Sequence, residues 1–194
     1  IRAVQERGMA ASAKHFPGDG LDERDQHLVT TINSFSCEEW EETYGKVYRA
    51  CIEAGVMTVM IGHIMQPAWS KRLNPGLADE QLLPATCSKE LLKGLLRDRL
   101  HFNGMIVTDA TNMCGTAVLM DRRKMLPAMI EAGCDMLLFA VNTEEDMQSI
   151  REALYNGDLS YERFEDAVTR ILALKAALNL PQKQRTNTLM PDHA

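Results

Sequence analysis

The sequence predicts an α/β fold built on a parallel β-sheet. Four segments are continuous runs of mainly apolar residues, namely 9–16, 56–63, 105–109 and 134–141. Continuous apolar runs are typical of parallel strands that are covered on both faces. Segments with helical periodicity separate these runs, and the spacing between successive strand ends, roughly 30 to 50 residues, suffices for a right-handed crossover.

The opening residues predict the end of a helix and then a first strand. Gly8 closes the helix as a C-terminal cap. The run 9–16 that follows contains Lys14 and His15 near its end, so we expect a buried strand with polar groups at its carboxyl end. The chain begins with Ile rather than Met, so we expect a piece of a longer protein, whose targeting signal and compartment stay open.

The next helix and strand are predicted between Ser36 and His63. Ser36 and Glu39 have the spacing of a capping box at the start of a helix. This helix continues to about Gly55, because apolar side chains recur at helical intervals, at Trp40, Tyr44, Val47 and Cys51. The second strand, 56–63, begins directly after the helix.

A further helix and the third strand follow a proline-containing loop. Ser88 is placed to cap a helix with an apolar face made of Leu91, Leu92, Leu95 and Leu96. Gly104 precedes the third strand, 105–109, which ends at Asp109.

The fourth strand is predicted between two helices. Residues 122–132 form the first of these helices, which ends at Gly133, and the apolar run 134–141 follows it. Thr143 and Asp146 then mark the start of the second helix, which ends at Gly157.

The last helix is predicted to begin at Ser160. One apolar stripe runs along it, made of Phe164, Val168, Ile171, Leu174 and Leu178. Residues 181–194 are polar and lack periodicity, so we expect a linker or a disordered tail.

Composition argues against several classes of protein. The formal net charge is -6, and no Lys/Arg run exceeds three residues, so we expect no nucleic-acid partner. The longest apolar runs have six residues, which predicts no membrane span. The cysteines are odd in number and never in CxxC spacing, so we expect small buried hydrophobes rather than disulfides or a zinc cage.

Titratable residues end three of the four predicted strands: Lys14 with His15, then His63, then Asp109. The carboxyl ends of parallel strands meet at one edge of a sheet, where α/β enzymes hold their active sites. For each of these residues taken alone, the alternative is that it caps or hydrogen-bonds a neighbouring loop. The loop after the first strand adds Asp25-Gln26-His27, a carboxylate close to an imidazole. For this loop taken alone, a solvated acidic segment is the alternative interpretation.

These residues carry a family resemblance. Residues 14–20, KHFPGDG, followed by Asp25-Gln26-His27, resemble the KHFPGHG…D-x-H signature of glycoside hydrolase family 3 β-N-acetylhexosaminidases. Residues 95–109 are similar to the family's LLRxxLGFxGxxxSD segment, and residues 59–68 to its sixth-strand region. The resemblance implies that residues 1–180 are half of a (β/α)8 barrel, its fifth to eighth strands, with residues 181–194 as a tail.

The resemblance also implies a role for each site residue. Asp109 matches the nucleophile of a retaining mechanism, His27 the general acid/base, and Asp25 the carboxylate that holds and polarises the His27 ring. Lys14 and His15 match residues that hydrogen-bond the sugar hydroxyls, and His63 is a further candidate for lining the same substrate pocket. The partner is then a carbohydrate, and we expect neither a metal nor an organic cofactor.

Three positions depart from the family pattern, and all bear on specificity. Asp19 stands where the signature has His, Gln26 stands where it has Ser, and Ala110 follows the nucleophile where many relatives have Asp. The first four strands of the barrel are also absent. An isolated half barrel would expose two sheet edges and an apolar face, so we expect self-association or a missing N-terminal half that covers them.

The resulting expectation is a retaining bacterial β-N-acetylglucosaminidase. Phosphorolysis by the same residues is the nearest alternative, because a histidine acid/base would not repel an incoming phosphate anion. Two further hypotheses are a metal-dependent barrel hydrolase that uses His15, His63 and Asp109, and a truncated, weakly active or non-catalytic fragment.

Overall fold

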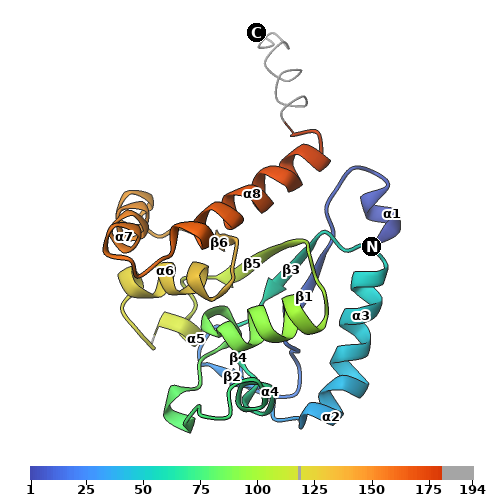
Figure 1. The fold of residues 1–194 in the computed structure, drawn as a ribbon. Coiled ribbons are helices and arrows are strands. Elements are labelled where there is room, and N and C mark those ends of the chain that lie inside the picture. The colour runs from blue at the N-terminus through green and yellow to red at the C-terminus, as the bar shows by residue number, and fades with distance from the viewer. Residues whose placement is uncertain (118, 181–194) are drawn as a thin grey trace.

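A computed structural model describes residues 1–117 and 119–180 as an α/β fold (Figure 1). The main sheet has four strands, all parallel, in the order β1-β3-β5-β6. They are β1 (Ser12–Phe16), β3 (Thr58–Ile61), β5 (Met105–Ala110) and β6 (Met136–Leu138). A second, parallel pair is formed by β2 (Thr31–Ile32) and β4 (Ile64–Met65). The predicted α/β class with a parallel sheet is therefore confirmed.

Helices precede, connect and follow the strands of the sheet. They are α1 (Arg2–Gln5), α2 (Cys37–Trp40), α3 (Lys46–Glu53), α4 (Pro67–Leu73), α5 (Cys114–Ala117), α6 (Arg122–Ala132), α7 (Thr143–Asn156) and α8 (Tyr161–Ala177). The π-helical segments are η1 (Glu41–Gly45), between α2 and α3, and η4 (Glu90–Arg99), and the 3-10 turns are η2 (Asp79–Gln81) and η3 (Ala85–Cys87). The sequence predicted the longer helices, whereas α4, α5 and the β2-β4 pair were not predicted.

The hydrophobic core lies between one face of the sheet and the helices. Val59, Ile61 and Ile106 point from β3 and β5 into this core and are fully buried. The predicted apolar face of η4 meets them, and all four of its leucines are fully buried: Leu91, Leu92, Leu95 and Leu96. In Figure 1, η4 is the green helix in front of the sheet.

Several helix ends form as predicted. The Ser36 hydroxyl accepts from the backbone N–H of Glu39 at 3.1 Å, and the Glu39 carboxylate accepts from the N–H of Ser36 at 2.8 Å. Both halves of the capping box are thus present. The Ser88 hydroxyl accepts from the N–H of Leu91 at 3.3 Å at the start of η4. Gly133 ends α6 with φ of 137°, a conformation that side chains disfavour.

The start of α7 differs from the prediction in its cap. The side chain of Asn142, rather than that of Thr143, accepts from the N–H of Glu145 at 3.4 Å. Asp146 is not part of a capping box, because its carboxylate accepts two hydrogen bonds from Arg122, at 2.7 and 2.8 Å. The Asp146 carboxylate, which the sequence pattern assigned to the helix cap, instead forms an ion pair with Arg122 of α6.

The prediction of four fully buried strands is wrong for the two edge strands. β1 starts three residues later than expected, Met9 is 64% exposed, and Ser12 and Lys14 are exposed. β6 keeps only Met136–Leu138 of the predicted run 134–141, and all three residues are half-buried. Among the described residues, each of these strands pairs with a strand on one side only, so its other edge is not covered by the sheet.

Two expectations for the C-terminal part and the cysteines also change. The predicted stripe on α8 is only partly covered, because Ala167 is the buried residue of this helix and Val168 is exposed. Cys114 is exposed and Cys51 half-buried, whereas the other three cysteines are buried as expected. The predicted tail, residues 181–194, lies outside the described residues. Within residues 1–117 and 119–180, no helix is long and apolar enough to cross a membrane.

Candidate active site

The structure brings Asp109 and His15 together at the carboxyl edge of the sheet. Asp109 lies near the end of β5, with 15% of its side chain exposed. One carboxylate oxygen, Oδ1, accepts from the backbone N–H of Ala110 at 2.8 Å. The other, Oδ2, lies 3.5 Å from Nε2 of His15, which comes from β1. The first and third predicted strand ends thus meet, although β3 lies between them in the sheet.

The loop after β1 approaches His15 from its other side. Asp19 Oδ2 lies 3.3 Å from Nδ1 of His15. The loop is held in place, because the Tyr44 hydroxyl donates to the Asp19 carbonyl at 3.0 Å and the Trp40 ring N–H donates to the Pro17 carbonyl at 2.6 Å. Gly18 is required here, since a Cβ on it would lie 2.5 Å from the Tyr44 ring and its φ is 138°.

His63 is fully buried directly after β3. Its Nδ1 lies 3.1 Å from the hydroxyl of Thr86, and its Nε2 lies 2.9 Å from the carbonyl of Ala110. A carbonyl only accepts, so Nε2 carries the proton and Nδ1 accepts from Thr86. Burial lowers the pKa of His63, which favours the neutral ring. His63 thus makes hydrogen bonds inside the protein, one of them to the backbone beside Asp109, and its role in lining the pocket stays a prediction.

The proposed acid/base pair lies on the exposed loop between β1 and β2. Nδ1 of His27 lies 2.7 Å from Oδ1 of Asp25, and the same oxygen accepts from the backbone N–H of His27 at 2.9 Å. Hydrogen bonds from the His27 backbone and then from its ring lower the pKa of Asp25. The ionised carboxylate therefore favours the tautomer of His27 that carries the proton on Nδ1. His27 is 71% exposed, so the ring is accessible.

A backbone contact ties this loop to the segment that follows β5. The carbonyl of His27 accepts from the N–H of Cys114 at 3.0 Å, at the start of α5. The Thr30 hydroxyl donates to the carbonyl of Gly115 at 2.6 Å. The loop that carries Asp25 and His27 thus packs against α5, which follows Asp109 in the chain.

Lys14 remains available for a ligand. It is exposed on β1, next to His15 in the chain. In the described part of the chain, its ammonium group has no hydrogen bond or ion pair.

Gln26 is a site residue that the sequence pointed to only as a departure from the family pattern. It is 6% exposed, although it lies between the exposed Asp25 and His27. Its amide donates from Nε2 to Asp19 Oδ2 at 3.0 Å and accepts through Oε1 from the N–H of His63 at 3.0 Å. A glutamine in an acidic loop predicts exposure, so only the fold reveals this role.

The alternative of a metal site finds no support in the geometry. Within the described residues, no three His, Cys, Asp or Glu side chains are grouped so that they could hold a metal ion. Both ring nitrogens of His63, one of the three residues considered for such a site, are hydrogen-bonded inside the protein.

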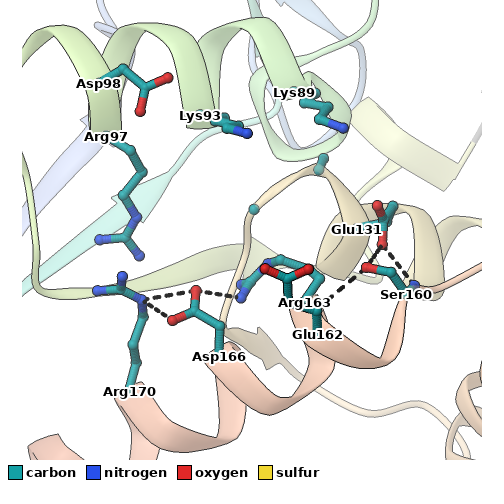
Figure 2. A pocket seen from close by; sticks show the side chains of 12 residues that line it. Lys89, Lys93, Arg97, Asp98, Glu131, Ser160, Glu162, Arg163, Asp166 and Arg170 are labelled. Carbon is teal, nitrogen blue, oxygen red and sulfur yellow. Dashed lines mark hydrogen bonds and ion pairs between the residues drawn. The ribbon is translucent and has the colours of Figure 1, made fainter.

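A separate hollow of about 390 Å³ lies between η4, the end of α6 and α8 (Figure 2). Arg97 and Arg163, which line it, both pair with the buried Asp135, at 2.8 and 2.5 Å. Arg97 also donates to the carbonyl of Gly104, directly before β5, so this hollow lies at the amino end of the strand. Asp109 is at the opposite end, so this hollow is distinct from the candidate site.

Comparison with known proteins identifies the family. The profile of the glycosyl hydrolase family 3 N-terminal domain matches residues 1–174. A protein of Cellulomonas fimi described as β-N-acetylglucosaminidase/β-glucosidase is 52% identical over 201 residues, which cover 100% of this chain and 36% of that protein.

Solved structures give the same result. A structure described as β-glucoside phosphorylase BglX superposes with a TM-score of 0.91 at 48% identity, covering 93% of this chain and 33% of that one. A family 3 β-N-acetylglucosaminidase from Paenibacillus superposes with a TM-score of 0.83 at 30% identity. This superposition covers 93% of the present chain and 33% of the Paenibacillus chain. The chain thus spans about a third of the length of these relatives. It belongs to glycosyl hydrolase family 3, whose N-terminal domain it matches over most of its length.

Proposed function

We propose that this chain carries the catalytic groups of a retaining enzyme that cleaves terminal β-linked N-acetylglucosamine. The observation that carries the proposal is the geometry at one sheet edge. The Asp109 carboxylate meets His15 there, and the exposed, hydrogen-bonded Asp25–His27 pair lies on a loop docked onto the segment after β5. Two carboxylates with an imidazole supply a nucleophile and an acid/base.

The first chemical step forms a glycosyl-enzyme. A carboxylate oxygen of Asp109 attacks the anomeric carbon while the bond from that carbon to the leaving oxygen breaks. Nε2–H of His27 donates its proton to the leaving oxygen, and ionised Asp25 stabilises the imidazole at Nδ1. His15, which lies beside Asp109, and Lys14, which precedes it in β1, are the proposed ligands of the sugar hydroxyls.

The second step releases the sugar. His27, now deprotonated at Nε2, takes a proton from water as the water oxygen attacks the anomeric carbon. The ester bond to Asp109 breaks, and its carboxylate is restored. The configuration at the anomeric carbon is retained because it is inverted twice.

We also propose that the four strands of the main sheet are the second half of a (β/α)8 barrel. The four strands are parallel, and the titratable residues lie at their carboxyl ends, as in barrel enzymes. The relatives are about three times longer, which leaves room for the other strands. The chain by itself would then be weakly active or inactive, because part of the sugar pocket would be missing.

Replacement of the nucleophile tests the proposed function. In the full-length gene product, Asp109→Asn should lower the turnover of an aryl β-N-acetylglucosaminide by about 1,000-fold or more while the fold is kept, since an amide is a poor nucleophile. Asp98→Asn, an exposed aspartate on η4, is the matched control and should retain activity. An Asp109→Asn enzyme within tenfold of the parent would contradict the assignment.

Phosphorolysis is the second candidate. It is favoured by the resemblance to the structure described as a β-glucoside phosphorylase, at 48% identity, and by an acid/base that is an imidazole rather than a carboxylate. In that case phosphate attacks the glycosyl-enzyme and the product is a glycosyl phosphate. The test is 31P NMR of the reaction in phosphate buffer, where a sugar phosphate signal supports phosphorolysis and free sugar alone supports hydrolysis.

A further inference from the structure

The two positions at which the acid/base region departs from the family signature contact each other. Asp19, in place of His, accepts through Oδ2 from the side-chain amide of Gln26, in place of Ser, at 3.0 Å. The same oxygen of Asp19 lies 3.3 Å from Nδ1 of His15. One carboxylate oxygen therefore links the residue beside the nucleophile to the loop of the acid/base pair.

These contacts continue to the nucleophile at both ends. On one side, Nε2 of His15 lies 3.5 Å from Asp109 Oδ2. On the other, the Gln26 amide oxygen accepts from the N–H of His63, and the His63 ring donates to the carbonyl of Ala110. The network starts at Asp109 and returns to the next residue of β5.

We propose that Asp19 and Gln26 act as one coupled pair of positioning residues. Asp19 orients the His15 ring so that Nε2 faces Asp109, and Gln26 ties that contact to the loop that carries His27. A ring held at one nitrogen has a fixed tautomer and a fixed direction for the other nitrogen. This inference rests on the proposed function and explains how the catalytic side chains of that function are held in position.

The surroundings leave the pair little freedom. Gln26 is nearly fully buried, and both ends of its amide are hydrogen-bonded. The second oxygen of Asp19 accepts from the N–H of Gly20 at 2.9 Å, and Tyr44 holds the Asp19 carbonyl. Loss of the Asp19 carboxylate leaves the Gln26 amide without its acceptor, and loss of the Gln26 amide leaves the Asp19 carboxylate without its donor. The two positions are therefore interdependent.

A double-mutant cycle in the full-length gene product tests the coupling. Asp19→Ala and Gln26→Ala should each lower kcat for an aryl β-N-acetylglucosaminide by about 100-fold and change KM by less than about threefold, because displaced groups slow the chemistry. The double variant should lie within about threefold of the worse single variant. Losses that multiply, to about 10,000-fold, would overturn the proposal.

Controls separate positioning from folding and from failure of the proposed function. Glu23→Ala, at an exposed residue of the same loop, should leave kcat unchanged, and all variants should keep the parent's Tm within a few degrees. A parent protein that cleaves no β-glycoside refutes the proposed function. A parent that is active but whose single variants show no loss of kcat, or lose kcat only in proportion to unfolding, refutes the coupling.

A measurement without substrate gives independent evidence. In 15N-histidine-labelled protein, the NMR shifts of His15 should report a proton on Nδ1. Asp19→Asn keeps an oxygen at this place and should preserve that tautomer, whereas Asp19→Ala should lose it. An unchanged His15 signal in Asp19→Ala would overturn the role of Asp19.

Discussion

His27, the proposed acid/base, is the residue whose replacement should affect substrates with good and poor leaving groups most differently. Its Nδ1 lies 2.7 Å from Oδ1 of Asp25, so in the proposed mechanism Nε2 is the nitrogen that transfers the proton. An activated aryl leaving group needs little protonation, whereas the oxygen of a natural disaccharide needs much. His27→Ala should therefore slow disaccharide cleavage by about 100-fold or more but the glycosylation step with an aryl substrate much less.

Rapid-quench kinetics checks this prediction. The variant should show a burst of released phenol followed by slow turnover, because deglycosylation also needs the base. Equal losses on both substrates would indicate that His27 orients groups without transferring a proton.

Burial of His63 makes the stability of the protein depend on pH. Burial lowers its pKa in the folded state below the ordinary value of 6.5. Above about pH 6.5 the ring is neutral in both states, and as the pH falls toward the lower folded pKa the unfolded chain binds more protons. The free energy of unfolding should thus fall in this range.

The variant His63→Gln should lose this part of the pH dependence. It should also be less stable at pH 7.5, by about 1 to 3 kcal/mol, because the hydrogen bonds to Thr86 and Ala110 are disturbed. Urea unfolding at several pH values measures both effects. A pH profile equal to that of the parent between pH 5 and 7 would contradict the assignment.

At the residue scale, the sequence located the candidate site but not the surroundings of its members. The motif spacing and strand ends placed Asp109 and His15 at one edge, and the structure brings them within 3.5 Å. Burial was not readable from the motif, so His63 was expected to face the pocket and Gln26 received no role. Both are fixed by long-range contacts, His63 to Thr86 and Gln26 to the N–H of His63.

At the scale of elements, a buried ion pair joins two helices to the sheet. The Asp135 side chain is fully buried; it accepts from Arg97 of η4 at 2.8 Å, from Arg163 of α8 at 2.5 Å and from the N–H of Ile106 at 2.7 Å. Removing this carboxylate leaves two largely buried guanidinium groups without their partner. Asp135→Ala should therefore cost about 3 to 5 kcal/mol of stability.

Asp166 offers a matched control on the same network. It pairs with Arg163 and Arg170 but is 48% exposed, so Asp166→Ala should cost about 1 kcal/mol or less. Urea unfolding of both variants provides the comparison. If Asp135→Ala is no less stable than Asp166→Ala, the buried pair does not hold η4 and α8 as described.

The ends of helices and strands could be predicted from the local sequence only where no contact with a distant segment determines them. The capping box at Ser36 and the glycine end of α6 are local, and both formed as predicted. The cap of α7 and the edge strands depend on Arg122 and on the number of strand neighbours. The local sequence pattern contains no information on the contact with Arg122 or on the number of neighbouring strands. The predictions of the α7 cap and of fully buried edge strands were therefore wrong.

At the scale of the whole molecule, the face of the sheet opposite the helical core is incompletely covered. Strand alternation and register place Met60, Met105, Val107, Met136 and Leu138 on this face. Met60, Met136 and Leu138 are half-buried on this face. Met105 and Val107 are buried, so they are less exposed than expected for an isolated half barrel. Within residues 1–117 and 119–180, β1 and β6 also each have one edge that pairs with no other strand.

We therefore predict that the 194-residue chain self-associates when it is produced alone. Full burial of an apolar side chain contributes about 1.5 to 3 kcal/mol relative to full exposure, so each half-buried side chain would gain part of this when a two-fold dimer covers this face on both copies. Sedimentation velocity at micromolar concentration should show a dimer. Met60→Lys, which charges this face, should shift the distribution to monomer, whereas Tyr155→Lys, at a 92% exposed position on α7, should not. A parent chain that sediments as a stable monomer would contradict the packing argument, and a monomer with full glycosidase activity would contradict the half-barrel proposal as well.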